Sequence, residues 1–191
     1  MIQAIKRLWS GMLPPERPSV GLGYLLRIAD ESGVNIEKEV CLIAIRGFYN
    51  KGQNQRGIYD DAIFLVKPTG VMAFNANVDP GVSKDGIAQL DAGVWSYMRG
   101  IHGLSKPKEK QYEALVQAKE VRVTRDNKGT DYGYFGINIH RGSKTSVSSE
   151  GCQTIHPDQW DEFIKAVMLS MVIRKQRVIK YILKEMNDEI Y

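Results

Sequence analysis

The alternation of apolar and polar residues predicts a chain built mostly from short strands. Val40–Arg46 is an almost continuous apolar run of strand length and predicts a buried strand. Ala62–Val66 and Val71–Asn75 flank Lys67–Gly70, where a proline is followed two positions later by a glycine. That spacing is typical of a hairpin turn, so these two runs predict paired strands. Glu120–Arg125 alternates as a strand does.

The second half of the chain continues this pattern. A turn signal at Asp126–Gly129 follows the preceding strand, and the alternation over Tyr134–His140 predicts a half-buried strand. His140 falls on the face opposite the isoleucines, so we expect it on the more open face. Gly93–Gly100 is aromatic and ambiguous, with a strand as one interpretation. The Val, Ile and Tyr residues of Arg177–Lys184 favour a final strand over a continued helix.

Helical patterns are fewer. Apolar residues in phase predict helices over Met1–Met12 and over Val20–Glu31. A third helix opens at Pro157, with acidic residues in its first turns, and is expected to end near Lys175. Lys106–Gln117 fits either a short helix or a charged surface loop, and the glycine-rich Gly47–Gly57 predicts an exposed loop. The fold class expected is therefore mainly β (α+β), as a sheet or sandwich with a few helices.

Composition and charge narrow the class of protein. The chain has 191 residues, of which 43% are hydrophobic and 25% charged, as in ordinary globular domains. We expect a helical segment over residues 1–36 and one domain over 37–191, or a single domain overall. The net charge of +4 is spread among acidic residues, which does not indicate nucleic-acid binding. The sequence shows no apolar run long enough to span a membrane and no signal-peptide pattern.

The stretch Gly136–Ile155 holds the candidate chemistry. It contains one of the two cysteines, Cys152, and one of the three histidines, His140, around a loop rich in hydroxyl residues. A thiol attacks as its thiolate, and a nearby histidine can accept the proton. Gly151 before the cysteine permits the tight backbone that exposes a nucleophile, and amides there can bind an oxyanion. Cys41 lies in an apolar run, which predicts a buried and inert thiol.

The other candidates are less suited to catalysis. His156 precedes Pro157, which favours a loop or capping role, and His102 lies in a Gly-Ile-His-Gly turn with no evident partner. Asp60, Asp61 and Asp79 fit exposed turn acids, because no His/Cys/acid spacing here matches a zinc or EF-hand site. The sequence therefore predicts neither a metal nor another cofactor.

The order His140-Arg141-Gly142, then Ser149-Glu150-Gly151-Cys152, resembles the signature of the L,D-transpeptidase (YkuD-like) catalytic domain. The version in phage-encoded and related peptidoglycan-active proteins is especially similar. The resemblance covers about a tenth of the chain. It implies an L,D-transpeptidase-like β-sandwich, with a helix after the catalytic cysteine.

The resemblance also implies roles. Cys152 would attack an amide of a peptidoglycan stem peptide, with His140 as base and then acid, and a backbone carbonyl, that of Gly142, would orient His140. The acyl group would pass to an amine or to water. Catalytic residues would be Cys152, His140, Gly142 and Gly151. The residues expected to contact the substrate are Asn138, Arg141, Ser148, Ser149, Gln153 and Thr154.

Several positions differ from the family's pattern. Glu150 replaces a histidine, Gln153 and Thr154 stand where an arginine often follows the cysteine, and the loop between His140 and Cys152 is shorter. Arg141 or Arg46 could supply the missing cation. These differences keep open an alternative, a catalytically retired module that binds peptidoglycan or has a structural role.

The expected place of action follows from the substrate. Without a signal peptide, the protein would be made in the cytoplasm and would reach the periplasm or cell wall by release or delivery. A phage lysis or virion protein, or a secreted effector, would meet this requirement. A papain-type peptidase is disfavoured, because such enzymes place the cysteine before the histidine in the chain. The oligomeric state stays open.

Overall fold

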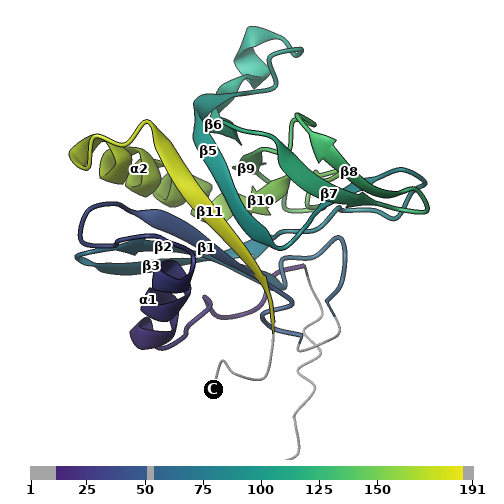
Figure 1. Ribbon diagram of the computed structural model, residues 1–191. Helices are drawn as coiled ribbons and strands as arrows, with labels where there is room; N and C mark the ends of the chain where they lie inside the picture. The colour runs from purple at the N-terminus through teal and green to yellow at the C-terminus, as the bar shows by residue number, and fades with distance from the viewer. Residues whose placement is uncertain (1–11, 51–53, 187–191) are drawn as a thin grey trace, which may run out of the picture.

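The protein folds as a β-barrel with an additional small sheet. The structure, a computed structural model, describes residues 12–50 and 54–186. Among these, eight strands pair into a closed barrel (Figure 1). Their order around it is β1 (Cys41–Arg46), β11 (Val178–Glu185), β5 (Gly93–His102), β6 (Tyr112–Gln117), β9 (Ile139–Arg141), β10 (Gln153–Ile155), β3 (Gly70–Asn77) and β2 (Asp61–Lys67).

The remaining elements are not strands of the barrel wall. A three-stranded sheet contains β4 (Ala88–Leu90), β7 (Val121–Arg125) and β8 (Gly129–Gly133). The two helices are α1 (Leu22–Glu31) and α2 (Pro157–Ile173), and a short 3-10 turn, η1 (Lys108–Lys110), joins β5 to β6. In Figure 1 the β7–β8 hairpin projects on the side opposite the two helices.

The mainly β, α+β fold class is confirmed, and its sheet arrangement differs from the sandwich that the sequence suggested. Two pairs, β1–β11 and β9–β10, are parallel, and the other barrel pairs are antiparallel. The short β9 closes the ring because Leu115 of β6 pairs with Ile139 on one side while β10 pairs on the other. Closure leaves no free edge in the barrel.

Most of the predicted elements are confirmed. The apolar run before Arg46 forms β1, and the predicted hairpin is β2–β3, joined by a turn in which Lys67 pairs with Gly70. The ambiguous aromatic run is β5, the final strand is β11, and α1 and α2 lie where the helical patterns predict them. The helix predicted over Met1–Met12 lies almost entirely outside the described residues.

Three predictions differ from the structure. Lys106–Gln117 is neither helix nor loop throughout, because Tyr112–Gln117 forms β6 and pairs with β5 over six residue pairs. The described residues of the Gly47–Gly57 segment, 47–50 and 54–57, form neither helix nor strand, as expected, yet Gly47 and Phe48 are buried. In the predicted strand Tyr134–His140, residues 134–138 belong to no strand, Gly136 has a φ of +71°, and β9 begins only at Ile139. Tyr112–Gln117 becomes a strand because β5 supplies its hydrogen-bond partners, which the local pattern does not report.

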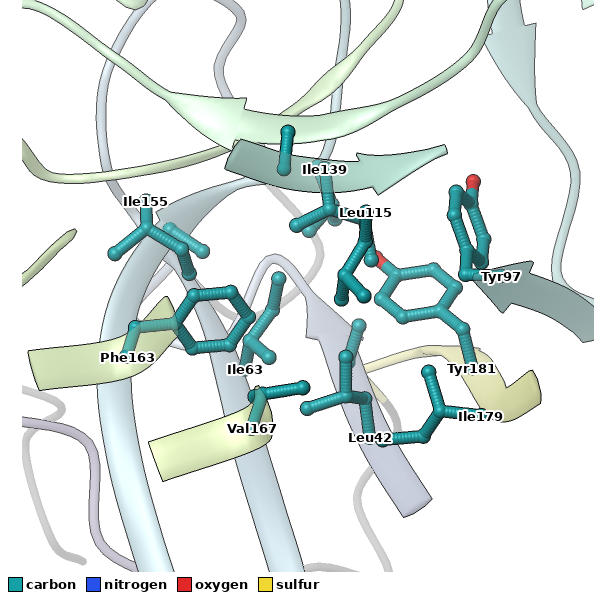
Figure 2. Packing of buried hydrophobic residues seen from close by; sticks show 14 of the residues in the cluster. Leu42, Ile63, Tyr97, Leu115, Ile139, Ile155, Phe163, Val167, Ile179 and Tyr181 are labelled. Atoms are coloured by element: carbon teal, nitrogen blue, oxygen red, sulfur yellow. The ribbon is translucent and has the colours of Figure 1, made fainter. Parts of the chain in front are cut away.

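The barrel core explains why the β1 and β2 sequences are continuously apolar. Alternate residues of each strand face opposite sides, and helices cover both. Leu42 of β1 and Ile63 of β2 face inward with Phe163 and Val167 of α2 (Figure 2). In the other direction, Cys41, Ile43, Ile45, Ala62, Phe64 and Val66 pack with Leu25, Ile28 and Ala29 of α1.

Arg46 ends β1 inside a buried charged cluster. Its Nε lies 2.7 Å from Asp79, and its Nη1 lies 2.6 Å from Glu185. Its Nη2 donates to the carbonyl oxygens of Val78 and Leu90 at 3.0 and 2.7 Å. These bonds occupy the guanidinium, which is only 4% exposed. Arg46 is therefore a structural residue, and the suggestion that it could bind a substrate carboxylate is wrong.

Replacing Arg46 with methionine is expected to lower the free energy of unfolding by about 3–5 kcal/mol, because removal of one partner leaves the buried Asp79 carboxylate uncompensated. Chemical denaturation measures the loss. The matched control is Arg99→Met, which removes the exposed ion pair with Glu113 and should change stability by about 1 kcal/mol or less. Equal effects of the two substitutions would contradict the prediction.

Candidate active site

The histidine and the cysteine singled out by the sequence line one cavity. His140 is the middle residue of β9, and Cys152 directly precedes β10. The parallel register pairs His140 with Thr154, which brings the two strands side by side and places both residues at the same end of the barrel. The cavity has a volume of about 540 Å³. It is lined by residues that include His102, Lys106, Asn138, His140, Glu150 and Cys152.

Backbone groups of the preceding extended segment hold the Cys152 thiol. The thiol donates to the carbonyl oxygen of Gly136 at 3.3 Å, and the amide of Asn138 donates to the sulfur at 3.4 Å. No hydrogen bond joins Cys152 to His140 in the described part of the chain. In this arrangement the thiol proton is directed to Gly136, and transfer to His140 requires the S–H bond to turn away from that carbonyl.

His140 is positioned from two sides. Its Nδ1 lies 2.9 Å from the carbonyl oxygen of Arg141, and its ring stacks on His102 with the centroids 4.0 Å apart. An Nδ1–H that donates to this carbonyl leaves Nε2 with its lone pair, as a base requires. The predicted carbonyl orienter was Gly142, and the structure corrects it to the neighbouring Arg141. His140 is also 3% exposed, so its predicted place on an open face is wrong.

Burial sets the ionisation of both groups. It lowers the pKa of His140 to about 4, with a further lowering from His102. It raises the pKa of the Cys152 thiol, against a smaller lowering by the Asn138 amide. Both groups are therefore uncharged at neutral pH. Such a pair would act by general-base transfer of the proton during attack.

The second cysteine provides a contrast. Cys41 has no exposed surface, and burial raises the pKa of its thiol to about 12. A thiol of that kind is neither accessible nor ionised at neutral pH. The predicted burial of Cys41 is confirmed.

Gly151 occupies a backbone conformation that requires glycine. Its φ is +144°, and a Cβ at this position would collide with the carbonyl oxygen of Ala88 in β4. The close approach of the Gly151 backbone to β4 fixes the turn that presents Cys152. The small sheet therefore supports the site from outside the barrel.

Gly151→Ala is expected to destabilise the protein by about 1–3 kcal/mol from backbone conformation alone, with the collision in addition. The matched control is Gly129→Ala, where φ is +79° and a Cβ would meet open space. That control should cost about 1–2 kcal/mol. Thermal and chemical denaturation measure both. A Gly151→Ala protein as stable as the control would show that the approach to Ala88 does not matter.

Gly142 is required by packing. A Cβ on Gly142 would collide with the hydroxyl of Tyr59, and that hydroxyl donates to the carbonyl oxygen of Ser143 at 2.8 Å. The Gly142 amide also donates to the carbonyl oxygen of Ile155 at 2.9 Å. Gly142 therefore anchors the loop after β9, while its carbonyl makes no contact with His140.

The residues expected to contact the substrate divide into two groups. Asn138, Ser148 and Ser149 line the cavity, although the Ser149 hydroxyl is engaged within the loop. Gln153 and Thr154 are completely buried in β10, which corrects their expected role because they cannot reach a ligand in the cavity. Consecutive strand residues point to opposite faces, so Gln153, which contacts Tyr181, faces the barrel interior, and Thr154 is buried on the other face.

Arg141 is exposed and lies outside this group. Its guanidinium packs over the ring of Tyr112, 4.9 Å from the centroid, and it is not among the residues lining the cavity. The cation that does line the cavity is Lys106, which the sequence suggested was part of a solvated run. Lys106 is a better-placed partner for an anionic group than Arg141 or Arg46.

Sequence reasoning also missed His102. The residue ends β5, two positions beyond the predicted aromatic strand, and its partner across the ladder is Tyr112 of β6. Its buried Nδ1 has no hydrogen-bond partner among the described residues. Only the unrecognised β5–β6 pairing places it against His140. In contrast, the capping role predicted for His156 is confirmed, since its side chain accepts from the amide of Asp158.

A second cavity continues the first past Cys152. It has a volume of about 420 Å³ and shares Glu150 and Cys152 with the first. Its other wall is built from the turn before β4 and from the Phe135–Ile137 segment. Cys152 thus lies between two hollows, with Lys106 in one and Lys84 and Arg125 in the other.

The described residues form neither a metal site nor a helix that could cross a membrane. Within residues 12–50 and 54–186, the structure contains no group of three or more His, Cys, Asp or Glu side chains able to hold a metal ion. Over the same ranges, neither helix combines the length and apolar character needed to cross a membrane.

Comparison of the chain with protein-family models, curated proteins and solved structures finds no match.

Proposed function

We propose that the protein is a cysteine-dependent acyl-transfer enzyme acting on peptidoglycan stem peptides, as an L,D-transpeptidase-like transferase or hydrolase. The observation that carries the proposal is the shared cavity of Cys152 and His140, in which a carbonyl oxygen orients the histidine. A nucleophile, a base and a group that orients the base are the parts that covalent acyl transfer needs. The choice of peptidoglycan rests on the sequence resemblance.

The two cavities that meet at Cys152 support transfer at a point within a longer substrate. A chain bound across the cysteine would place residues on either side of the attacked bond in the two hollows. Basic side chains line both hollows, Lys106 in the first and Lys84 and Arg125 in the second, and they suit a substrate with carboxylate groups, which stem peptides carry. The proposal includes action at the cell wall, in a phage lysis or virion role.

In the proposed reaction, the Cys152 sulfur attacks the carbonyl carbon of the scissile amide, while His140 Nε2 accepts the thiol proton. The carbonyl π electrons move to oxygen, and the C–N bond then breaks as His140 returns the proton to the leaving amine. The thioester next passes its acyl group to water or to another amine. His140 assists by taking the proton of that second nucleophile.

The test is incubation of the purified protein with diaminopimelate-type muropeptides, followed by mass spectrometry of the products. We expect a mass change that corresponds to cleavage or exchange at one peptide bond. Protein alkylated beforehand with iodoacetamide is the control and should be inactive. Absence of product with the untreated protein, or product that survives complete alkylation of Cys152, would refute the proposal.

A second candidate function is a retired module that binds peptidoglycan without turnover. The observation that favours it is the Cys152 thiol itself, which donates to Gly136, makes no bond to His140 and has a raised pKa. Binding of muropeptides in isothermal titration, together with no alkylation of Cys152 at neutral pH, would select this function. Alkylation and turnover would exclude it.

A further inference from the structure

The carbonyl oxygen of Gly151 points into the barrel and is held there by Gln153. The Gln153 Nε2 donates to this oxygen at 3.2 Å, and the Gln153 Oε1 accepts from the Tyr181 hydroxyl at 2.9 Å. Gln153 and Tyr181 have no exposed surface. Figure 2 shows Tyr181 extending from β11 into the interior beside Tyr97. A buried amide and a buried hydroxyl are therefore used to hold one backbone carbonyl.

The orientation of this carbonyl fixes the amide of Cys152. The Gly151 carbonyl and the Cys152 N–H belong to the same peptide group, and the described residues contain no cis peptide bond. In a trans peptide the N–H points opposite to the C=O. Because the carbonyl points inward, the Cys152 N–H points outward. Among the described residues, this N–H has no hydrogen-bond partner.

The peptide groups on either side are held by Ser149. The Gly151 amide donates to the Ser149 Oγ at 3.0 Å, and the Ser149 hydroxyl donates to the Cys152 carbonyl oxygen at 2.6 Å. Three consecutive peptide groups are thus fixed by two side chains. Of the polar groups in this turn, the Cys152 N–H is left facing the side from which a substrate would approach.

We propose that Gln153, held by Tyr181, is a positioning residue that keeps the Cys152 amide aimed at the oxyanion of the acyl-transfer intermediate. This inference rests on the proposed function and deepens it. When the Cys152 sulfur bonds to a carbonyl carbon, negative charge forms on the adjacent oxygen, within reach of the same residue's N–H. A donor held in place before charge develops stabilises the transition state more than one that must reorient.

The burial of Gln153 supports a specific role. A buried amide without hydrogen bonds is costly, so an apolar residue is the ordinary occupant of an inward position in a barrel strand. Its neighbour Ile155 in β10 is such a residue. Gln153 instead makes hydrogen bonds at both ends, one of them to the peptide group that carries the candidate donor.

The test compares two reactions of the same thiol in Gln153→Met. p-Nitrophenyl acetate reacts through a tetrahedral oxyanion, with release of p-nitrophenolate and transfer of the acetyl group through the thioester to water. Iodoacetamide alkylates the sulfur with loss of iodide and forms no oxyanion. We expect p-nitrophenolate release to fall by about 10²-fold, as for loss of an oxyanion donor. The alkylation rate at the same pH should change by less than about twofold, because the thiol and its Asn138 contact are kept.

A double variant separates positioning from simple damage to the core. Gln153→Met leaves the Tyr181 hydroxyl buried without its partner, and adding Tyr181→Phe removes that hydroxyl. The double variant should regain thermal stability while p-nitrophenolate release stays low. Recovery of the rate together with stability would show that the loss in the single variant came from the unpaired hydroxyl, and would overturn the inference.

The outcomes separate the two proposals. If the wild type releases no p-nitrophenolate above the Cys152→Ala background, the proposed acyl-transfer function fails, and the positioning role fails with it. If the wild type is active and Gln153→Met matches it, only the positioning role is overturned. Equal falls in acylation and alkylation would also overturn it, since they would indicate an altered thiol.

Discussion

Replacing Cys152 with alanine is expected to abolish turnover of stem peptides, with a fall in rate of about 10⁴-fold or more, as found when a covalent nucleophile is removed. The expectation follows from the place of the thiol between two hollows and beside a fixed imidazole. At about 1.4 kcal/mol for each tenfold change, this loss is about 5.5 kcal/mol of transition-state stabilisation. Mass spectrometry of muropeptide products measures it.

The matched control is Cys41→Ala, which removes the other thiol. Cys41 is the first residue of β1 and lies in the cluster that this strand forms with α1 on the outer face of the barrel. Its removal should lower stability modestly and leave the rate for each folded molecule unchanged. Equal losses of activity in the two variants, or retained activity in Cys152→Ala, would show that Cys152 is not the nucleophile.

The elements easiest to predict from sequence are those whose pattern reflects their own burial. β1 and β2 are apolar along their length because a helix covers each face, and α2 begins at a proline with an acidic first turn. Each of these signals lies within the element that it predicts. The β2–β3 hairpin is likewise specified by Pro68 and Gly70 in its turn.

What the sequence could not predict depends on pairing between distant segments. Tyr112–Gln117 looks like a helix or loop because its neighbours are charged, yet it becomes a strand when β5 supplies its hydrogen-bond partners. The same pairing carries His102 to His140, which no spacing in the sequence indicates. The closed barrel depends on the β6–β9 pair Leu115–Ile139, whose partners lie further apart in the sequence.

In the candidate site, too, some residues can be predicted from the sequence and others cannot. Cys152, His140 and Gly151 are identified by residue type and order, because nucleophile, base and glycine carry a chemical requirement. The family resemblance predicts that Gln153 contacts the substrate, because it stands where an arginine often follows the cysteine, whereas the structure buries its side chain completely. Gln153 holds the carbonyl oxygen of Gly151, so the role proposed for it acts through the peptide group between Gly151 and Cys152.

His140→Ala is expected to lower the rate of acyl transfer about as much as Cys152→Ala, because nucleophile and base act as a unit. His140→Gln, which keeps a similar shape without a base, should be equally inactive. Muropeptide turnover measures both variants, and thermal denaturation checks that they fold. A His140→Gln protein with more than about a tenth of the wild-type rate would contradict the assignment, since general bases contribute about 10²-fold or more.

The pH dependence tests the same residue in the wild type. A base acts in its neutral form, and burial followed by the charge of His102 lowers the pKa of His140 to about 4. Activity should therefore persist as pH falls below 6.5, the ordinary histidine value, and should be lost only as pH passes through about 4. A histidine in a solvated site would lose activity near 6.5 instead.

The neighbouring ring supplies the matched variant. His102→Phe keeps a ring against His140 and removes a group that can become charged, so the pKa of His140 should rise and the acidic limb of the rate profile should move to higher pH. Lys106 also lowers this pKa and remains in the variant, so only part of the shift is expected. An acidic limb near pH 6.5 in the wild type, unmoved by His102→Phe, would mean that His140 does not titrate as the buried base of this site.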